Sequence, residues 1–82
     1  MANTDEVMTR LQILFREILD MPDLTLTEQL SAKDIPEWDS LNHVRIIAAA
    51  EQKFSVRLTA AELDKLKNVG DLTSLIATKM AA

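Results

Sequence analysis

The chain contains no cysteine, no tyrosine, one glycine and two prolines among its 82 residues. Without cysteine it has no disulfide, no thiolate metal site and no cysteine nucleophile. Few glycines and prolines, with only 4% aromatic residues, disfavour a β-sandwich or small barrel, which needs many tight turns and strand-forming residues. No apolar run approaches the length of a membrane span. The first residues do not show the basic segment followed by an apolar run that is typical of a signal peptide. We therefore expect a cytoplasmic protein that does not insert into a membrane.

The charge of the chain is acidic and unevenly distributed. The net charge of −4 argues against a nucleic-acid-binding protein, because such proteins carry a basic face. Residues 17–39 hold seven acids and one base, so this segment carries −6 and the rest of the chain +2. We interpret the segment either as an ordinary solvated loop or as an acidic flank that steers basic partners.

Leucine and alanine are the most frequent residues, and both favour helix. The length allows one domain, which we place at residues 1–82. The apolar spacing predicts an all-α fold, a four-helix bundle of three longer helices and one short helix. A long ordered loop is expected between the first and second helices.

The first helix is expected over residues 5–20, with Asn3 and Glu6 as a capping pair and Pro22 closing the segment. Residues 21–39 have no sustained period, and structureless loops of this length are uncommon and often functional. Apolar residues recur along the loop as if they fix it to a core. These residues are Leu24, Leu26, Leu30, Ile35 and Trp38.

The second helix is expected over residues 40–53, with Asp39 as a good N-cap. It has two apolar faces, whereas a surface helix needs one. The first face, which we assign to the core, consists of Ile46, Ile47, Ala50 and Phe54. Leu41, Val44 and Ala48 form the second face, which either packs under the long loop or is exposed for a partner.

Two further helices are expected near the end of the chain. Thr59 and Glu62 match a capping box for a short helix that ends near Leu66, and Asn68 with Asp71 repeats the capping pattern for the last helix. The inward-facing residues are expected to be Leu63 and Leu66, then Val69, Leu72, Leu75 and Ile76.

Ser40 is the residue with the clearest chemical potential. It is a hydroxyl at the start of a helix, directly after an acid and at the end of a long loop. Helix N-termini favour phosphate, so this serine is well placed to carry a phosphate ester. The alternative is that Ser40 is only a helix cap.

The run Trp38–Val44, with Asp39-Ser40-Leu41 at its centre, resembles the attachment motif of acyl carrier proteins, and the similarity extends over nearly the whole chain. The resemblance implies that Ser40 takes a covalent 4′-phosphopantetheine arm from coenzyme A through a separate phosphopantetheinyl transferase with magnesium. The arm's thiol would then carry acyl groups as thioesters between acyl-loading and acyl-processing enzymes. The chain itself has no thiol, so a thioester would require the thiol of an added group. Asp39 would help hold the transferase's magnesium, since that ion prefers oxygen ligands.

A catalytic role is not expected. Asp39, Ser40 and His43 include the residue types of a hydrolytic triad, but Asp39 is adjacent to Ser40 and cannot orient the far side of the imidazole. We interpret His43 as a partly buried structural histidine and Trp38 as an anchor between loop and helix. The sequence predicts no metal site of its own.

The charge of the second helix bears on the pathway. Many fatty-acid carriers have a strongly acidic second helix, whereas this one holds Arg45, Glu51 and Lys53 and is net +1. This favours a carrier in a specialised pathway, such as polyketide or lipid-tailoring synthesis, with fatty-acid synthesis as the other option. An aminoacyl or peptidyl carrier is the alternative. Peptidyl carriers usually have glycine where Trp38 stands, so the sequence disfavours the peptidyl type and leaves the aminoacyl type open.

A non-modified helical interaction domain is the competing class of function. In either case we expect a monomer whose partner-binding residues are Leu41, Val44, Arg45, Ala48 and Glu37.

Overall fold

The structure is a computed structural model that describes residues 4–81. Helix α1 spans Thr4–Leu19, α2 spans Ser40–Phe54, α3 spans Ala60–Leu63 and α4 spans Val69–Ala81, and this part of the chain contains no strand. The expected all-α bundle with three longer helices and one short helix is confirmed. No helix within residues 4–81 is both long enough and apolar enough to cross a bilayer.

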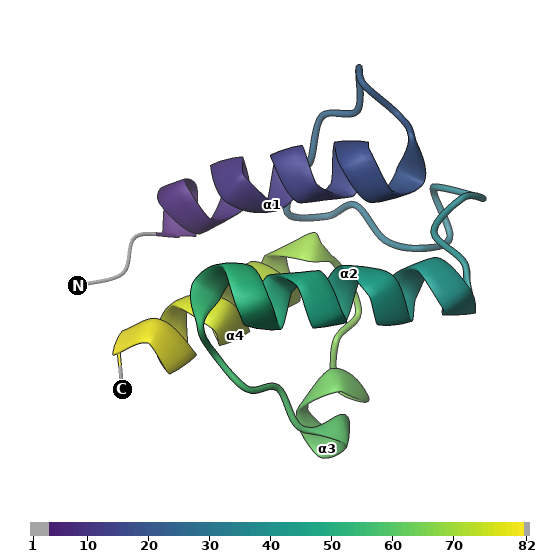
Figure 1. Cartoon of the computed structure of the whole chain (residues 1–82). Helices are drawn as coiled ribbons and strands as arrows, with labels where there is room; N and C mark the ends of the chain where they lie inside the picture. Colours follow the sequence, from purple (N-terminus) through teal and green to yellow (C-terminus); the bar gives the residue numbers. More distant parts are fainter. Residues whose placement is uncertain (1–3, 82) are drawn as a thin grey trace.

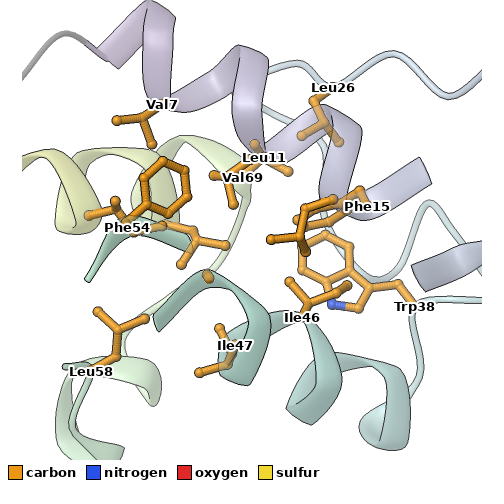
Figure 2. Packing of buried hydrophobic residues seen from close by; sticks show 14 of the residues in the cluster. Val7, Leu11, Phe15, Leu26, Trp38, Ile46, Ile47, Phe54, Leu58 and Val69 are labelled. Atoms are coloured by element: carbon orange, nitrogen blue, oxygen red, sulfur yellow. The ribbon is translucent and has the colours of Figure 1, made fainter. Parts of the chain in front are cut away.

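Helix α1 lies across α2 and α4 and contacts both (Figure 1). Each of these three helices turns one apolar stripe toward the shared interior, and the long loop adds further side chains to it. Figure 2 shows this core, in which Phe15 of α1 lies beside Trp38 from the loop. The predicted core stripe of α2 is confirmed, because all four of its residues are buried. The largest fully buried side chains are Phe15, Leu11, Ile46, Leu72, Ile76, Val7 and Val69.

The ends of α1 and α2 are set by residues in the left-handed conformation. Asp20 has a φ of 54°, so α1 stops at Leu19 rather than continuing through Asp20 as expected. Ser55 also has a φ of 54°, and its N–H donates a hydrogen bond to the Glu51 carbonyl oxygen. Helix α2 therefore ends at Phe54, one residue later than expected. The expected capping residue Asn3 lies outside the described residues.

The loop of residues 20–39 is fixed to both α1 and α4. Its backbone accepts a 2.6 Å hydrogen bond from Arg16 Nε at Leu24 O, and Leu26 N donates to Gln12 Oε1 at 2.8 Å. On the α4 side, the loop carbonyls of Glu28 and Leu30 accept hydrogen bonds from the first two amides of α4, at 2.9 and 2.8 Å. Leu26, Ile35 and Trp38 are buried, and Leu24 and Leu30 pack against the same cluster. The loop is therefore ordered, as predicted.

Helix α3 is shorter than expected, since it ends at Leu63 and not near Leu66. After Leu63 the amides of Lys65 and Leu66 bond three residues back rather than four, so the chain continues as turns. The predicted capping box is confirmed, with Glu62 N donating to Thr59 Oγ1 at 3.2 Å and Thr59 N donating to Glu62 Oε1 at 3.0 Å.

Candidate functional site

The junction between the long loop and α2 places Ser40 at the first position of the helix. Asp39 is the N-cap, because its Oδ1 accepts a 2.9 Å hydrogen bond from Asn42 N. The alternative in which Ser40 caps the helix is therefore wrong. Ser40 is exposed, and its hydroxyl makes no hydrogen bond to any part of residues 4–81.

The backbone around this hydroxyl has unused donors. Within the described chain, the N–H groups of Ser40 and Leu41 have no acceptor, whereas the next amide is taken by Asp39. Free amides and the positive end of the helix dipole favour an anionic group at this position. The exposed hydroxyl and the two amides fit a phosphodiester on Ser40.

Three hydrogen bonds and one ring stack hold the junction together. Asn42 Nδ2 donates to Glu37 O at 2.8 Å, and His43 N donates to Asp39 O at 2.8 Å. Trp38 Nε1 donates to His43 Nδ1 at 3.1 Å, and the two rings stack with centroids 6.1 Å apart. The bracing role of Asn42 was missed from the sequence. An amide side chain in the first turn after an acidic cap was the signal that could have revealed it.

Trp38 is the anchor that joins the loop to the core, as predicted. It is only 7% exposed, and its ring meets Phe15 edge-on with centroids 5.0 Å apart. This edge-to-face arrangement adds packing energy beyond the buried area alone. The residue two positions before Ser40 is thus held by α1, which fixes where α2 begins.

The geometry does not form a hydrolytic triad. His43 Nδ1 accepts from Trp38, so an indole and not a carboxylate orients the imidazole. His43 is half-buried, as expected for a structural histidine, and it makes no hydrogen bond to Ser40. Residues 4–81 also contain no cluster of three or more side chains able to hold a metal ion.

The second apolar face of α2 is exposed. Leu41 is 68% exposed and Val44 64% exposed, and Ala48 is exposed on the same face. The alternative in which this face packs under the long loop is therefore wrong. Arg45 and Glu37 are exposed beside it. We call Leu41, Val44 and Ala48 the apolar ridge.

Comparison with known proteins places the chain in a family. Residues 9–76 match the family described as phosphopantetheine attachment site. The chain belongs to the phosphopantetheine attachment family. Members of this family are carriers and not catalysts, and they hold a covalently attached 4′-phosphopantetheine. Their partners include phosphopantetheinyl transferases and acyl-processing enzymes.

Individual relatives agree with this family assignment. The chain is 36% identical to an acyl carrier protein of Acidothermus cellulolyticus over 73 residues, 89% of this chain and 87% of that protein. It is 30% identical to an acyl carrier protein of Thermotoga maritima over 80 residues, 98% of this chain and 99% of that protein. A solution structure of the holo acyl carrier protein from Geobacter metallireducens superposes with a TM-score of 0.87 and 40% identity, covering 92% of this chain and 86% of that one.

Proposed function

We propose that Ser40 is the residue that carries the 4′-phosphopantetheine arm, whose thiol holds acyl intermediates as thioesters and passes them between partner enzymes. The observation that carries this assignment is the exposed, unbonded Ser40 hydroxyl beside two free amides at the start of α2. In the transfer step the Ser40 oxygen bonds to the pantetheine-side phosphorus of the coenzyme A diphosphate. The bond from that phosphorus to the bridging oxygen breaks, adenosine 3′,5′-bisphosphate leaves, and the serine proton passes to the transferase or to water. Residues 1–82 act as one carrier domain, and we expect a monomer in the cytoplasm.

Asp39 has one carboxylate oxygen left for a second role. Its Oδ1 caps α2, while within residues 4–81 its other oxygen has no partner. Magnesium takes oxygen ligands and keeps several waters, so one protein carboxylate suffices when phosphates supply the rest. Asp39 would then contact the magnesium that the transferase brings, without leaving its place as the cap.

The apolar ridge is the proposed docking surface for partner enzymes. The ridge begins at Leu41, the residue after Ser40, and continues along the exposed face of α2. An enzyme bound there would therefore lie close to the arm. An apolar centre with charges at its rim is the usual anatomy of a modest, transient interface. Glu37 and Arg45 act mainly on encounter rate and partner choice, and the ridge acts on the lifetime of the complex.

The charge of α2 supports a specialised pathway, with polyketide or lipid-tailoring synthesis ahead of fatty-acid synthesis. Arg45 and Lys53 are exposed, whereas the one acid, Glu51, accepts a 2.9 Å hydrogen bond from Leu58 N. The cationic groups of the helix are therefore the ones presented to partners. An aminoacyl or peptidyl carrier is the alternative within the same chemistry.

Intact mass spectrometry tests the attachment residue. The wild-type protein is incubated with coenzyme A, magnesium and a broad-specificity transferase, beside Ser40→Ala and Ser74→Ala. Ser74 is an exposed helical serine far along the chain, so it controls for loss of a surface hydroxyl. We expect one arm on the wild type and on Ser74→Ala, and none on Ser40→Ala. An arm on Ser40→Ala overturns the assignment.

A further inference from the structure

Two side chains in the first turn of α2 reach back past Ser40 to the end of the long loop. Asn42 Nδ2 donates to the Glu37 carbonyl oxygen at 2.8 Å. His43 Nδ1 accepts from Trp38 Nε1 at 3.1 Å. Each bond joins residues five positions apart, so both bonds span Ser40. We call these two hydrogen bonds the clasp.

The clasp is anchored in the core through Trp38. The indole is only 7% exposed, and its ring meets Phe15 of α1 edge-on with centroids 5.0 Å apart. Trp38 and His43 also border a cavity of about 80 Å³, so packing alone leaves the indole space to turn. The bond to His43 Nδ1 fixes the rotation of the ring, because a buried indole nitrogen can only donate and needs an acceptor.

The start of α2 has two neighbouring residues of the capping type. Aspartate and serine rank about equally as N-caps, so residue type alone does not choose between Asp39 and Ser40. In the structure Asn42 N donates to Asp39 Oδ1 at 2.9 Å and His43 N donates to Asp39 O at 2.8 Å, as in a helix capped by Asp39. In a helix that began one residue later, Ser40 Oγ would accept from the Asn42 or His43 amide and would no longer be free.

The two starts of α2 differ in the backbone of Ser40. A capping residue has extended dihedral angles, whereas the first residue of a helix has helical ones. A change of Ser40 from helical to extended would swing residues 37–39 away from the first turn and break both bonds of the clasp. The clasp therefore favours the start at which the Ser40 hydroxyl is free.

We propose that Asn42 and His43 are positioning residues for attachment of the arm, because the clasp holds the start of α2 at Ser40 and keeps its hydroxyl available. The inference rests on the proposed attachment at Ser40. Each of the two side chains acts through a loop residue and not on the reacting atoms. One net hydrogen bond corresponds to about a fivefold change in an equilibrium, so loss of both bonds shifts α2 about 25-fold toward the start capped by Ser40.

This shift should lower kcat for phosphopantetheine transfer and leave KM for the carrier nearly unchanged. The apolar ridge begins at Leu41, which is helical in both starts of α2, so a transferase can dock on either form. Only the form that starts at Ser40 presents a free hydroxyl. Loss of a merely structural contact would instead unfold the domain or leave kcat unchanged.

Substitutions of similar shape separate the clasp bonds from packing. His43→Leu removes the acceptor, whereas His43→Asn places a carbonyl oxygen where Nδ1 stands. Asn42→Asp removes the donor and adds an acid to the first turn, where it favours helix. Gln52→Glu makes the same amide-to-acid change on an exposed residue near the other end of α2 and is the matched control.

Transfer kinetics are measured with saturating coenzyme A and magnesium and with the carrier varied. We expect His43→Leu combined with Asn42→Asp to lower kcat at least about twofold at nearly constant KM. His43→Asn in place of His43→Leu should restore part of kcat, and Gln52→Glu should keep the wild-type values. If circular dichroism shows that the double variant is unfolded, the single variants His43→Leu and His43→Asn are compared instead.

Nuclear magnetic resonance reports the start of α2 without a transferase. The Ser40 Cα and Cβ chemical shifts distinguish a helical residue from an extended one. In the double variant they should move toward extended values, and Trp38 Nε1–H should exchange faster with solvent. Both signals should keep their wild-type values in Gln52→Glu.

The outcomes separate this inference from the proposed function. If the mass of the wild-type protein shows no arm on Ser40, the proposed function fails and the inference fails with it. If Ser40 is modified but the clasp variants keep the wild-type kcat or change only KM, only the inference is overturned. Equal kcat for His43→Leu and His43→Asn also overturns it, as does a loss of kcat while the Ser40 shifts remain helical.

Discussion

Replacing Val44 with aspartate separates a docking surface from a buried one. The side chain of Val44 is 64% exposed, while Ile47, three residues further along the same helix, is only 6% exposed. Valine and aspartate have similar helix propensities, so Val44→Asp should leave the helix content and the melting temperature nearly unchanged. Ile47→Asp places a charge in the core and should unfold the protein.

The size of the functional effect follows from the area that Val44 has left to bury. Complete burial of a valine side chain contributes roughly 1.5–3 kcal/mol, and scaling this range by the exposed fraction gives about 1–2 kcal/mol at a partner interface. That free energy corresponds to about a 5- to 30-fold loss in kcat/KM for phosphopantetheine transfer. The introduced carboxylate adds a desolvation penalty, so this range is a lower bound.

The assay combines circular dichroism with transfer kinetics for both variants. The expected result is a folded Val44→Asp protein with slow transfer beside an unfolded Ile47→Asp protein. A folded Val44→Asp protein with wild-type kcat/KM would refute the docking surface. Loss of helix in Val44→Asp would refute the exposed position of this side chain.

Three further changes have defined outcomes. Leu72→Ala should lower the free energy of unfolding, measured in urea, by about 2–5 kcal/mol, because Leu72 is buried in the core. Ser40→Ala should change this free energy little. Equal free energies of unfolding for the two variants would contradict the core assignment. Arg45→Glu should shift preference toward enzymes that serve acidic carriers, as measured by kcat/KM with two transferases, and an unchanged ratio would exclude Arg45 from partner choice. The 2.8 Å hydrogen bond and ion pair with Lys79, together with hydrogen bonds from the backbone and side chain of Thr59, lower the pKa of Glu62 from 4.5 to about 2. The ionised carboxylate therefore stabilises the fold above pH 4.5, and this contribution is lost as the pH falls through about 2. Glu62→Gln should flatten the dependence of stability on pH in acid unfolding. A pH profile identical to that of the wild type would contradict the interaction.

The sequence was sufficient for the features that depend on local patterns. Helical spacing identified the three long helices and the buried stripe of α2, and the capping box at Thr59 and Glu62 was recognised because its residues are three apart. The acid before Ser40 was correctly identified as the N-cap, since capping depends on residue type at one position. These are short-range effects that the order of residues specifies directly.

The path of the long loop and the packing around Trp38 depend on tertiary contacts, which local sequence patterns do not predict. The long loop is held by bonds from its carbonyls at Glu28 and Leu30 to the start of α4, and no local pattern relates segments forty residues apart. The close approach explains the single glycine, because a Cβ on Gly70 would lie 3.1 Å from the Glu28 carbonyl oxygen. The bond between Trp38 and His43, and the cavity that they border, likewise depend on how the loop packs.

We propose that Ser40, and no other serine of the chain, carries the arm. The most direct measurement is fragmentation mass spectrometry of the modified wild-type protein after proteolysis, which locates the added mass among the four serines of the chain. We expect the arm to map to Ser40 within the peptide that begins after Lys33. An arm that maps to Ser31, Ser55 or Ser74 would contradict it.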